Sequence, residues 1–151
     1  GYYGDAARTF AVGTPSPLAE KLLAVTRESL HLAVEKLVPG GRLSDVGAVV
    51  QRHVERHGFS EVREFVGHGI GTALHEEPQV PNYGQPGRGP RLREGLVVAV
   101  EPMVNAGGPE VKMDGDGWTA RTRDGSLSAH FEFSIAVTAN GPRVLGLEVA
   151  A

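Results

Sequence analysis

The chain has 151 residues, no cysteine and a formal net charge of −3. A chain of this length can bury about two-thirds of its unfolded surface, so we expect one domain, residues 1–151, that folds without disulfides. The composition excludes thiolate chemistry and cysteine-based zinc sites in this chain, and it is compatible with a cytoplasmic location. The charge and the lack of a long apolar run predict neither specific nucleic acid nor membrane among its partners.

The N-terminal residues, GYYGDAARTF, predict a strand because they alternate with a period of two. The residues that share one face of it are Tyr3, Asp5, Ala7 and Thr9. No initiator methionine precedes them, so we expect the chain to be part of a longer protein.

A first helix is predicted after this strand, with Ser16 as its N-cap and Pro17 in its first turn. The apolar residues at helical spacing are Leu18, Leu22, Val25, Ala33 and Leu37. The sequence Pro-Gly-Gly at residues 39–41 is expected to end this helix.

A second helix is predicted next, and Gly58 is its expected C-terminal cap. Its apolar face contains Leu43, Val46, Val50 and Val54. The histidines in this region, His31, His53 and His57, are interpreted as surface residues or helix-dipole partners rather than metal ligands.

From Glu61 onward the pattern predicts strands. The run LVVAVEP, residues 96–102, is nearly all apolar, which is typical of a strand covered on both faces. Turn sequences at residues 114–117, 123–126 and 140–141 separate three further short strands. Two helices among many antiparallel strands predict an α+β domain.

Four residues could bring acid or imidazole groups together: Asp5, His68, Glu101 and Glu132. For three of them, a surface carboxylate or a hydrogen-bonded histidine is the simpler interpretation. Glu101 differs because it continues an apolar strand, where an ionised carboxylate needs a salt bridge or a metal. Carboxylates with one imidazole suit Mn²⁺, Co²⁺, Fe²⁺ or Zn²⁺. The residues alone leave metal and salt bridge open.

The stretch FVGHGIGTALHEEP, residues 65–78, places His68 and His75 among three alternating glycines. Glycine is tolerated where a ligand or another backbone approaches closely. The stretch is not the helical zinc-protease motif, because its second histidine is not four residues after the first and proline interrupts it.

Four segments together resemble type I methionine aminopeptidases of the pita-bread metallopeptidase fold. They are GDAARTF, FVGHGIGTALHEEPQVPNYG, VAVEPMVNAGG and DGWTARTRDGSLSAHFEFSIAVT, in this order along the whole chain. GHGIG or VEP alone would equally resemble proline-specific relatives. The resemblance predicts an α+β domain with the pita-bread fold.

The resemblance also implies roles for individual residues. It implies that Asp5, His68, Glu101 and Glu132 are ligands of a site that holds up to two divalent ions, with Co, Mn, Fe, Zn or Ni as the metal. It assigns His75 to the substrate and Glu101 to proton transfer, so these two are the expected catalytic residues. Trp118, and Leu74 by position, are implied to line the methionine pocket, although on sequence alone an ordinary core aromatic is the simpler interpretation of Trp118.

The function implied by the resemblance is removal of the initiator methionine from nascent peptide N-termini by metal-activated water, in the cytoplasm and near the ribosome. The family has a further aspartate ligand, a catalytic histidine and part of the methionine pocket in segments that precede this sequence. We therefore expect a domain that lacks most of its N-terminal half and associates with that segment or with itself. The activity of the chain alone is left open.

Two alternative functions remain open. A proline-specific peptidase of the same fold fits less well, because EPMVNAG and DGWT follow the methionine aminopeptidase pattern. A non-catalytic pita-bread binding module need not retain metal ligands, whereas every ligand position inside this chain is filled.

Overall fold

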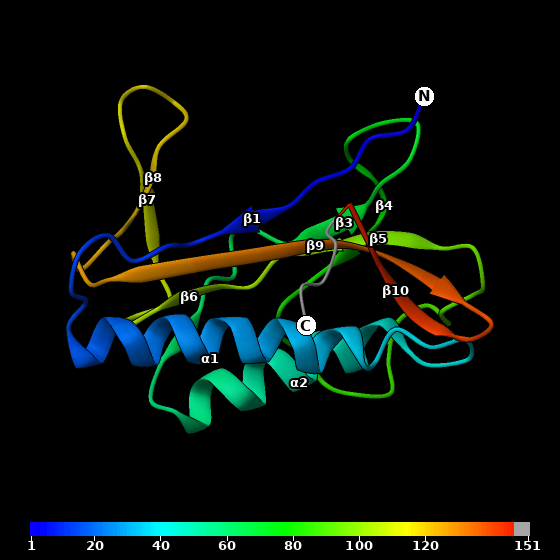
Figure 1. Cartoon of the computed structure of the whole chain (residues 1–151), viewed down its shortest axis with the longest axis horizontal. Coiled ribbons are helices and arrows are strands. Elements are labelled where there is room, and N and C mark those ends of the chain that lie inside the picture. The colour runs from blue at the N-terminus through cyan, green and yellow to red at the C-terminus, as the bar shows by residue number, and fades with distance from the viewer. Residues whose placement is uncertain (147–151) are drawn as a thin grey trace.

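The computed structural model describes residues 1–146, which form two helices and ten strands. The helices are α1 (Pro17–Val34) and α2 (Leu43–Arg56). The strands are β1 (Ala7–Arg8), β2 (Ser60–Glu61), β3 (Gly67–Gly69), β4 (Glu76–Val80), β5 (Val97–Val100), β6 (Met103–Asn105), β7 (Val111–Met113), β8 (Ala120–Thr122), β9 (Ser128–Thr138) and β10 (Gly141–Leu145). Both helices lie on one side of the sheet, and β1 runs along the other side (Figure 1). The expected α+β class is confirmed.

The long strand β9 is the centre of the sheet. The strand order is β2-β6-β9-β5-β3-β4, and β1 and β10 also pair with β9. All these pairs are antiparallel, and β7 and β8 form a separate hairpin that projects from the sheet (Figure 1). With 11 residues, β9 is longer than the short strand that the sequence predicted.

The first helix begins as predicted, because Ser16 accepts a hydrogen bond from the backbone N–H of Ala19 at 3.2 Å and Pro17 follows it. The helix ends at Val34, before the Pro-Gly-Gly sequence. Leu37 is fully buried but lies in the turn after the helix. Leu18, which we placed on the apolar face, is half exposed.

The second helix also follows the prediction, and Gly58 after it adopts the left-handed conformation with φ of 81°. His31 is exposed, as expected, but the surface assignment of His53 is wrong. Its ring is buried, with Nε2 3.2 Å from Glu28 Oε2 and Nδ1 2.9 Å from Arg56 Nη2. His53 therefore joins the two helices.

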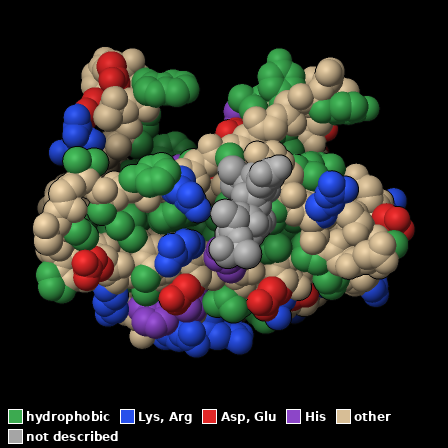
Figure 2. Space-filling model, in the orientation of Figure 1, with side chains coloured by type: hydrophobic (Ala, Val, Ile, Leu, Met, Phe, Trp, Pro, Cys, Tyr) green, Lys and Arg blue, Asp and Glu red, His purple; other side chains and the backbone are tan. Residues whose placement is uncertain are grey.

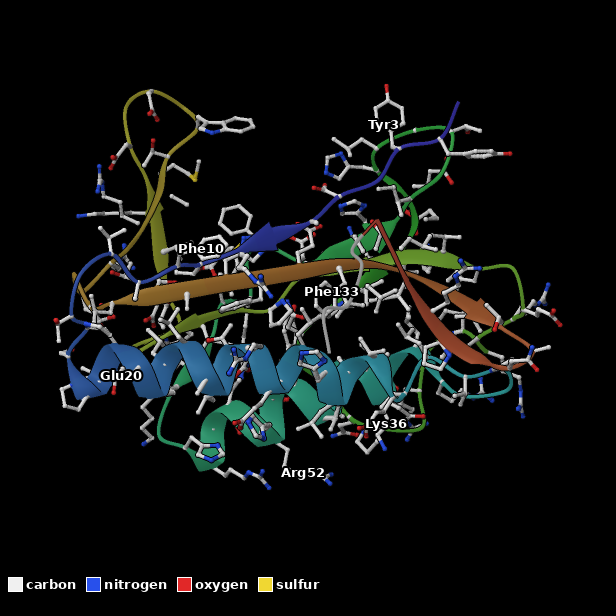
Figure 3. The ribbon with its side chains drawn as sticks, viewed as in Figure 1. Tyr3, Phe10, Glu20, Lys36, Arg52 and Phe133 are labelled. Atoms are coloured by element: carbon white, nitrogen blue, oxygen red, sulfur yellow. The ribbon has the colours of Figure 1, made fainter. Side chains whose placement is uncertain are left out.

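Side chains of β9 alternate between the two faces of the sheet. Phe131 and Ile135 are buried in the core. The side chain of Phe133 points from β9 toward the helices, where its ring meets the edge of His31 at 5.7 Å between centroids (Figure 3). Glu132 and Ser134 therefore face the opposite side.

Two differences concern the strands near the site. The first strand is shorter than predicted, so Asp5 precedes β1. Strands β4 and β6 were not predicted. Among residues 1–146, neither helix is long and apolar enough to cross a membrane.

Candidate metal centre

Four acidic or imidazole side chains converge on the side of the sheet that the helices leave free. His68 comes from β3, Glu101 directly follows β5, Glu132 comes from β9 and Asp5 lies two residues before the start of β1. Asp5, His68 and Glu132 each offer one ligand atom, and these atoms all lie within 4.8 Å of one another. The sheet thus brings together groups that are up to 127 positions apart in the sequence, because β1, which follows Asp5, pairs with the strand that carries Glu132.

Glu101 adjoins this group through His68. Its Oε1 lies 3.5 Å from His68 Nε2, and Asp5 Oδ2 lies 4.0 Å from the same nitrogen. All four residues that the resemblance named are therefore neighbours, while their role as metal ligands stays a prediction.

The backbone fixes which nitrogen of His68 faces the carboxylates. His68 Nδ1 is 2.9 Å from the carbonyl oxygen of Gly69, a geometry in which Nδ1–H donates to this oxygen. The neutral ring then carries its lone pair on Nε2, the atom that faces Asp5 and Glu101. A hydrogen bond of this kind is what orients a metal-binding histidine.

Burial and mutual repulsion raise the pKa values of two of the carboxyls. Burial, followed by the charge of Asp5, raises the pKa of Glu101 to about 7. Burial, followed by the charges of Glu101 and Asp5, raises the pKa of Glu132 to about 8. Moreover, Glu132 Oε1 is buried and has no hydrogen-bond partner among residues 1–146. A divalent cation would satisfy that oxygen and relieve the repulsion, so oxygen donors with one imidazole fit a metal such as Mn²⁺, Co²⁺, Fe²⁺ or Zn²⁺.

His75 lies beside the cluster rather than in it. Its ring is 4.3 Å from the ring of His68 between centroids, and its side chain is exposed. It is therefore placed to meet a molecule that approaches the four groups from solvent.

The two residues expected to line a substrate pocket lie on surface loops. Leu74 is in the turn between β3 and β4 and is 37 % exposed, and Trp118 is in the turn between β7 and β8 and is 88 % exposed. The interpretation of Trp118 as a core aromatic is wrong, because the hairpin that carries it stands clear of the sheet (Figure 1). Its role toward a substrate stays a prediction.

The surface is hollowed between two projections (Figure 2). By their place in Figure 1, these are the β7–β8 hairpin and the β3–β4 turn with the N-terminal residues. The segment that carries Asp5 runs between them. The hollow therefore gives solvent access on the side of the sheet where the four groups meet.

Two of the three glycines around His68, Gly67 and Gly69, are required by the neighbouring strands. A Cβ atom on Gly67 would collide with the carbonyl oxygen of Ala99 in β5, and one on Gly69 with that of Glu77 in β4. A Cβ on Gly71 would lie 3.0 Å from a carboxylate oxygen of Glu76. Close backbone packing, which the sequence indicated, thus holds His68 between two strands.

Sequence reasoning missed two residues that adjoin Glu101. His130 Nε2 is buried and lies 3.8 Å from Glu101 Oε2, and burial lowers the pKa of His130. Asn82 is 1 % exposed and donates from Nδ2 to the backbone carbonyl of Glu101 at 3.1 Å. His130 is two residues from Glu132, so the period of a strand already places both on one face, but no sequence signal indicated Asn82.

The sequence profile described as Metallopeptidase family M24 matches residues 1–139. The chain belongs to metallopeptidase family M24. This M24 chain is 56 % identical over 147 residues to methionine aminopeptidase A of Synechocystis, a match that covers 97 % of this chain and 58 % of that protein. It is 52 % identical over 145 residues to methionine aminopeptidase 1 of Bacillus subtilis, with 96 % and 58 % covered.

Solved structures agree with the expected pita-bread fold. Methionine aminopeptidase of Thermotoga maritima matches the M24 chain with a TM-score of 0.94 and 50 % identity, covering 95 % of this chain and 58 % of that one. The prolidase of Pyrococcus horikoshii matches with a TM-score of 0.73 and 26 % identity, covering 95 % and 36 %. The M24 chain thus spans less than two-thirds of these relatives, and its resemblance to methionine aminopeptidases is confirmed.

Proposed function

We propose that the protein that carries this chain is a methionine aminopeptidase, which hydrolyses the first peptide bond of nascent proteins and peptides that begin with methionine. The observation that supports this most directly is the convergence of Asp5, His68, Glu101 and Glu132 on one side of the sheet. Membership of M24 and identities near 50 % to methionine aminopeptidases support the same reaction.

The same four residues are proposed to hold up to two divalent ions, with Co, Mn, Fe, Zn or Ni as the metal. Ions bound there would lower the pKa of water and polarise the peptide carbonyl. Glu101 is the proposed proton carrier: its carboxylate accepts a proton from the attacking water and gives it to the departing amine. Its position supports this role, because Glu101 Oε1 lies 3.5 Å from His68 Nε2 and Glu101 therefore borders the proposed metal centre.

His75 is the proposed substrate-binding group. Its exposed ring beside His68 can donate a hydrogen bond to the peptide next to the bond that is cleaved. Leu74 and Trp118 are proposed to contact the methionine side chain from the two projections that border the hollow. Unpaired apolar side chains at these positions are available for a substrate to cover.

The proposed location is the cytoplasm, near the ribosome, where nascent N-termini appear. Association with a preceding segment of the longer protein, or with a second copy, is proposed as well, because the chain spans 58 % of its relatives.

The test measures hydrolysis of Met-Ala-Ser against Ala-Pro and Gly-Pro by the full-length protein loaded with Mn²⁺ or Co²⁺. We expect cleavage of Met-Ala-Ser and loss of ~10²-fold or more of the turnover in Glu101→Gln, which keeps the shape of the side chain but cannot accept the proton. Cleavage of the proline peptides alone would support the proline-specific alternative. Metal binding without cleavage of any of these peptides would favour a binding module.

A further inference from the structure

The backbone of Asp5 lies outside the sheet, two residues before β1 begins. Strand β1 pairs with β9 only through Ala7 opposite Glu132 and Arg8 opposite Phe131. Continued in the same register, the next inward-facing residue, Asp5, would lie opposite Ser134. That place is already taken, because Leu145 of β10 is the partner of Ser134 on this side of β9. The backbone of Asp5 therefore has no strand to join.

The hydroxyl of Ser134 takes the place of the missing strand pairing. Its Oγ accepts a hydrogen bond from the backbone N–H of Asp5 at 2.9 Å and donates one to the backbone carbonyl of Asp5 at 2.8 Å. Ser134 is 3 % exposed, and the backbone of β9 holds it firmly because it also pairs with Ala99 of β5. One side chain thus satisfies both polar backbone groups of Asp5.

The position of the Asp5 carboxylate depends on this contact. It reaches across β9 to meet His68 Nε2 at 4.0 Å and lies within 4.8 Å of a Glu132 carboxylate oxygen. Neither His68 nor Glu132 holds the backbone of Asp5, whose N–H and C=O bond to Ser134. Ser134 is two residues from Glu132 on the same face of β9, so it ties Asp5 to the strand that carries its partner.

We propose that Ser134 is a positioning residue, whose hydroxyl sets the place of the metal ligand Asp5 by bonding its backbone N–H and C=O. The inference rests on the proposed metal centre. Ser134 itself touches neither metal nor substrate; it acts through Asp5. Removal of outer groups that orient metal ligands typically weakens metal affinity ~10–100-fold.

The chain offers a matched control at the other end of β1. Thr9 Oγ1 accepts from the backbone N–H of His130 at 2.9 Å and donates to its carbonyl at 2.9 Å. This is the same two-bond contact with a neighbouring backbone, but the backbone that Thr9 holds is that of His130, which is not one of the four proposed ligands. Thr9→Ala and Ser134→Ala therefore each delete two hydrogen bonds between β9 and the segment that contains β1.

The test titrates the full-length protein with Mn²⁺ by calorimetry. We expect Ser134→Ala to raise the Kd of the first Mn²⁺ ion ~10-fold or more. In Ser134→Thr, which keeps a hydroxyl, the Kd should stay within ~3-fold of that of the unmodified protein. Thr9→Ala should also keep the Kd within ~3-fold, while it lowers the melting temperature about as much as Ser134→Ala does. Hydrogen exchange of the Asp5 amide in the metal-free protein should accelerate in Ser134→Ala and not in Thr9→Ala. If Ser134→Ala does not fold, Ser134→Cys, with its weaker hydrogen bonds, takes its place.

Asp5→Asn separates the two claims. If Asp5→Asn binds Mn²⁺ as tightly as the unmodified protein, the proposed metal centre is wrong. If Asp5→Asn loses affinity but Ser134→Ala or Cys does not, or if Thr9→Ala loses as much as Ser134→Ala, the centre stands and the role of Ser134 is overturned.

Discussion

Asn82 holds the backbone of Glu101 at the point where the chain passes from β5 to β6. The strands β5 and β6 pair with different parts of β9, and Glu101 with Pro102 forms the step between them. At this step the carbonyl of Glu101 receives its hydrogen bond from the buried amide of Asn82.

We expect Asn82→Ala to weaken divalent metal binding ~10-fold, because the carboxylate of Glu101 then loses the anchor of its own backbone. Asn105→Ala is the control, since Asn105 is equally buried and donates to the carbonyl of Gly108, which is in a loop. Calorimetric titration and thermal unfolding measure the two effects. Equal loss of metal affinity in both variants would mean that Asn82 acts only on general stability.

His75→Ala should lower turnover ~10²-fold or more while leaving metal affinity nearly unchanged, because His75 lies beside His68 and outside the four-residue cluster. His31→Ala is the matched control at an exposed histidine distant in sequence and on α1. Peptide kinetics and metal content by atomic absorption give the result. Loss of metal from His75→Ala would make this histidine a ligand.

The metal-free protein should become less stable as pH rises from about 5 to 9. The ordinary pKa of a glutamate, 4.5, is raised in the fold to about 7 for Glu101 and about 8 for Glu132. A carboxyl whose pKa is raised by folding contributes stability that is fully present below pH 4.5. This contribution is lost as pH rises through the folded pKa values of about 7 and 8. Urea unfolding with chelator present measures the trend.

In the same experiment, Glu132→Gln should flatten the alkaline decline and raise metal-free stability at pH 8 by ~1 kcal/mol or more. The same variant should bind metal weakly, so stability and metal affinity change in opposite directions. An unchanged decline in Glu132→Gln would show that the repulsion among these carboxyls is not its cause.

A second pH effect should appear on the acid side. Burial, then Arg56 and His57, lowers the pKa of His53 from its ordinary value of 6.5. The stability that neutral His53 contributes is therefore present above pH 6.5 and is lost as pH falls below it. His53→Gln should reduce the acid decline in melting temperature between pH 6.5 and 5, whereas His57→Gln, which removes only the smallest of these three causes, should reduce it less. A decline of the same size in all three proteins would contradict this origin.

Gly69→Ala should cost ~1–3 kcal/mol of unfolding free energy or more, because the added methyl group meets the backbone of Glu77 and must push β4 away. Gly115→Ala, in the β7–β8 turn with open space around it, should stay within ~0.5 kcal/mol. Chemical denaturation gives both values. Tolerance of Gly69→Ala would show that β4 yields to the methyl group.

The sequence predicted local structure well where the signal was local. Ser16 with Pro17, and Gly58, mark helix ends through their own backbone and side-chain chemistry. The burial of His53 could also have been predicted, because it lies three residues after Val50 on the apolar face of α2. Strand β4 could not, because its sequence EEPQV is polar and contains proline, which only an edge strand tolerates.

The proximity of the four residues could be predicted from the resemblance and not from residue patterns. Glu101 alone carried a local signal, a carboxylate at the end of an apolar run. Asp5, His68 and Glu132 meet only because β9 brings their strands together, and a single sequence does not contain the strand order. Asn82 and Ser134 act on backbone groups, so their types and spacing gave no indication of their contacts.

The position of β9 between β1, β5, β6 and β10 also sets the order of events in folding. The four groups come from segments that are distant in sequence and share a site only after β9 has neighbours on both sides, so loop closure must precede their meeting. A divalent ion that needs all four groups would bind the native state and not the folding transition state. Such an ion slows unfolding without accelerating folding, and the lifetime of the folded protein, rather than its rate of formation, then depends on metal supply.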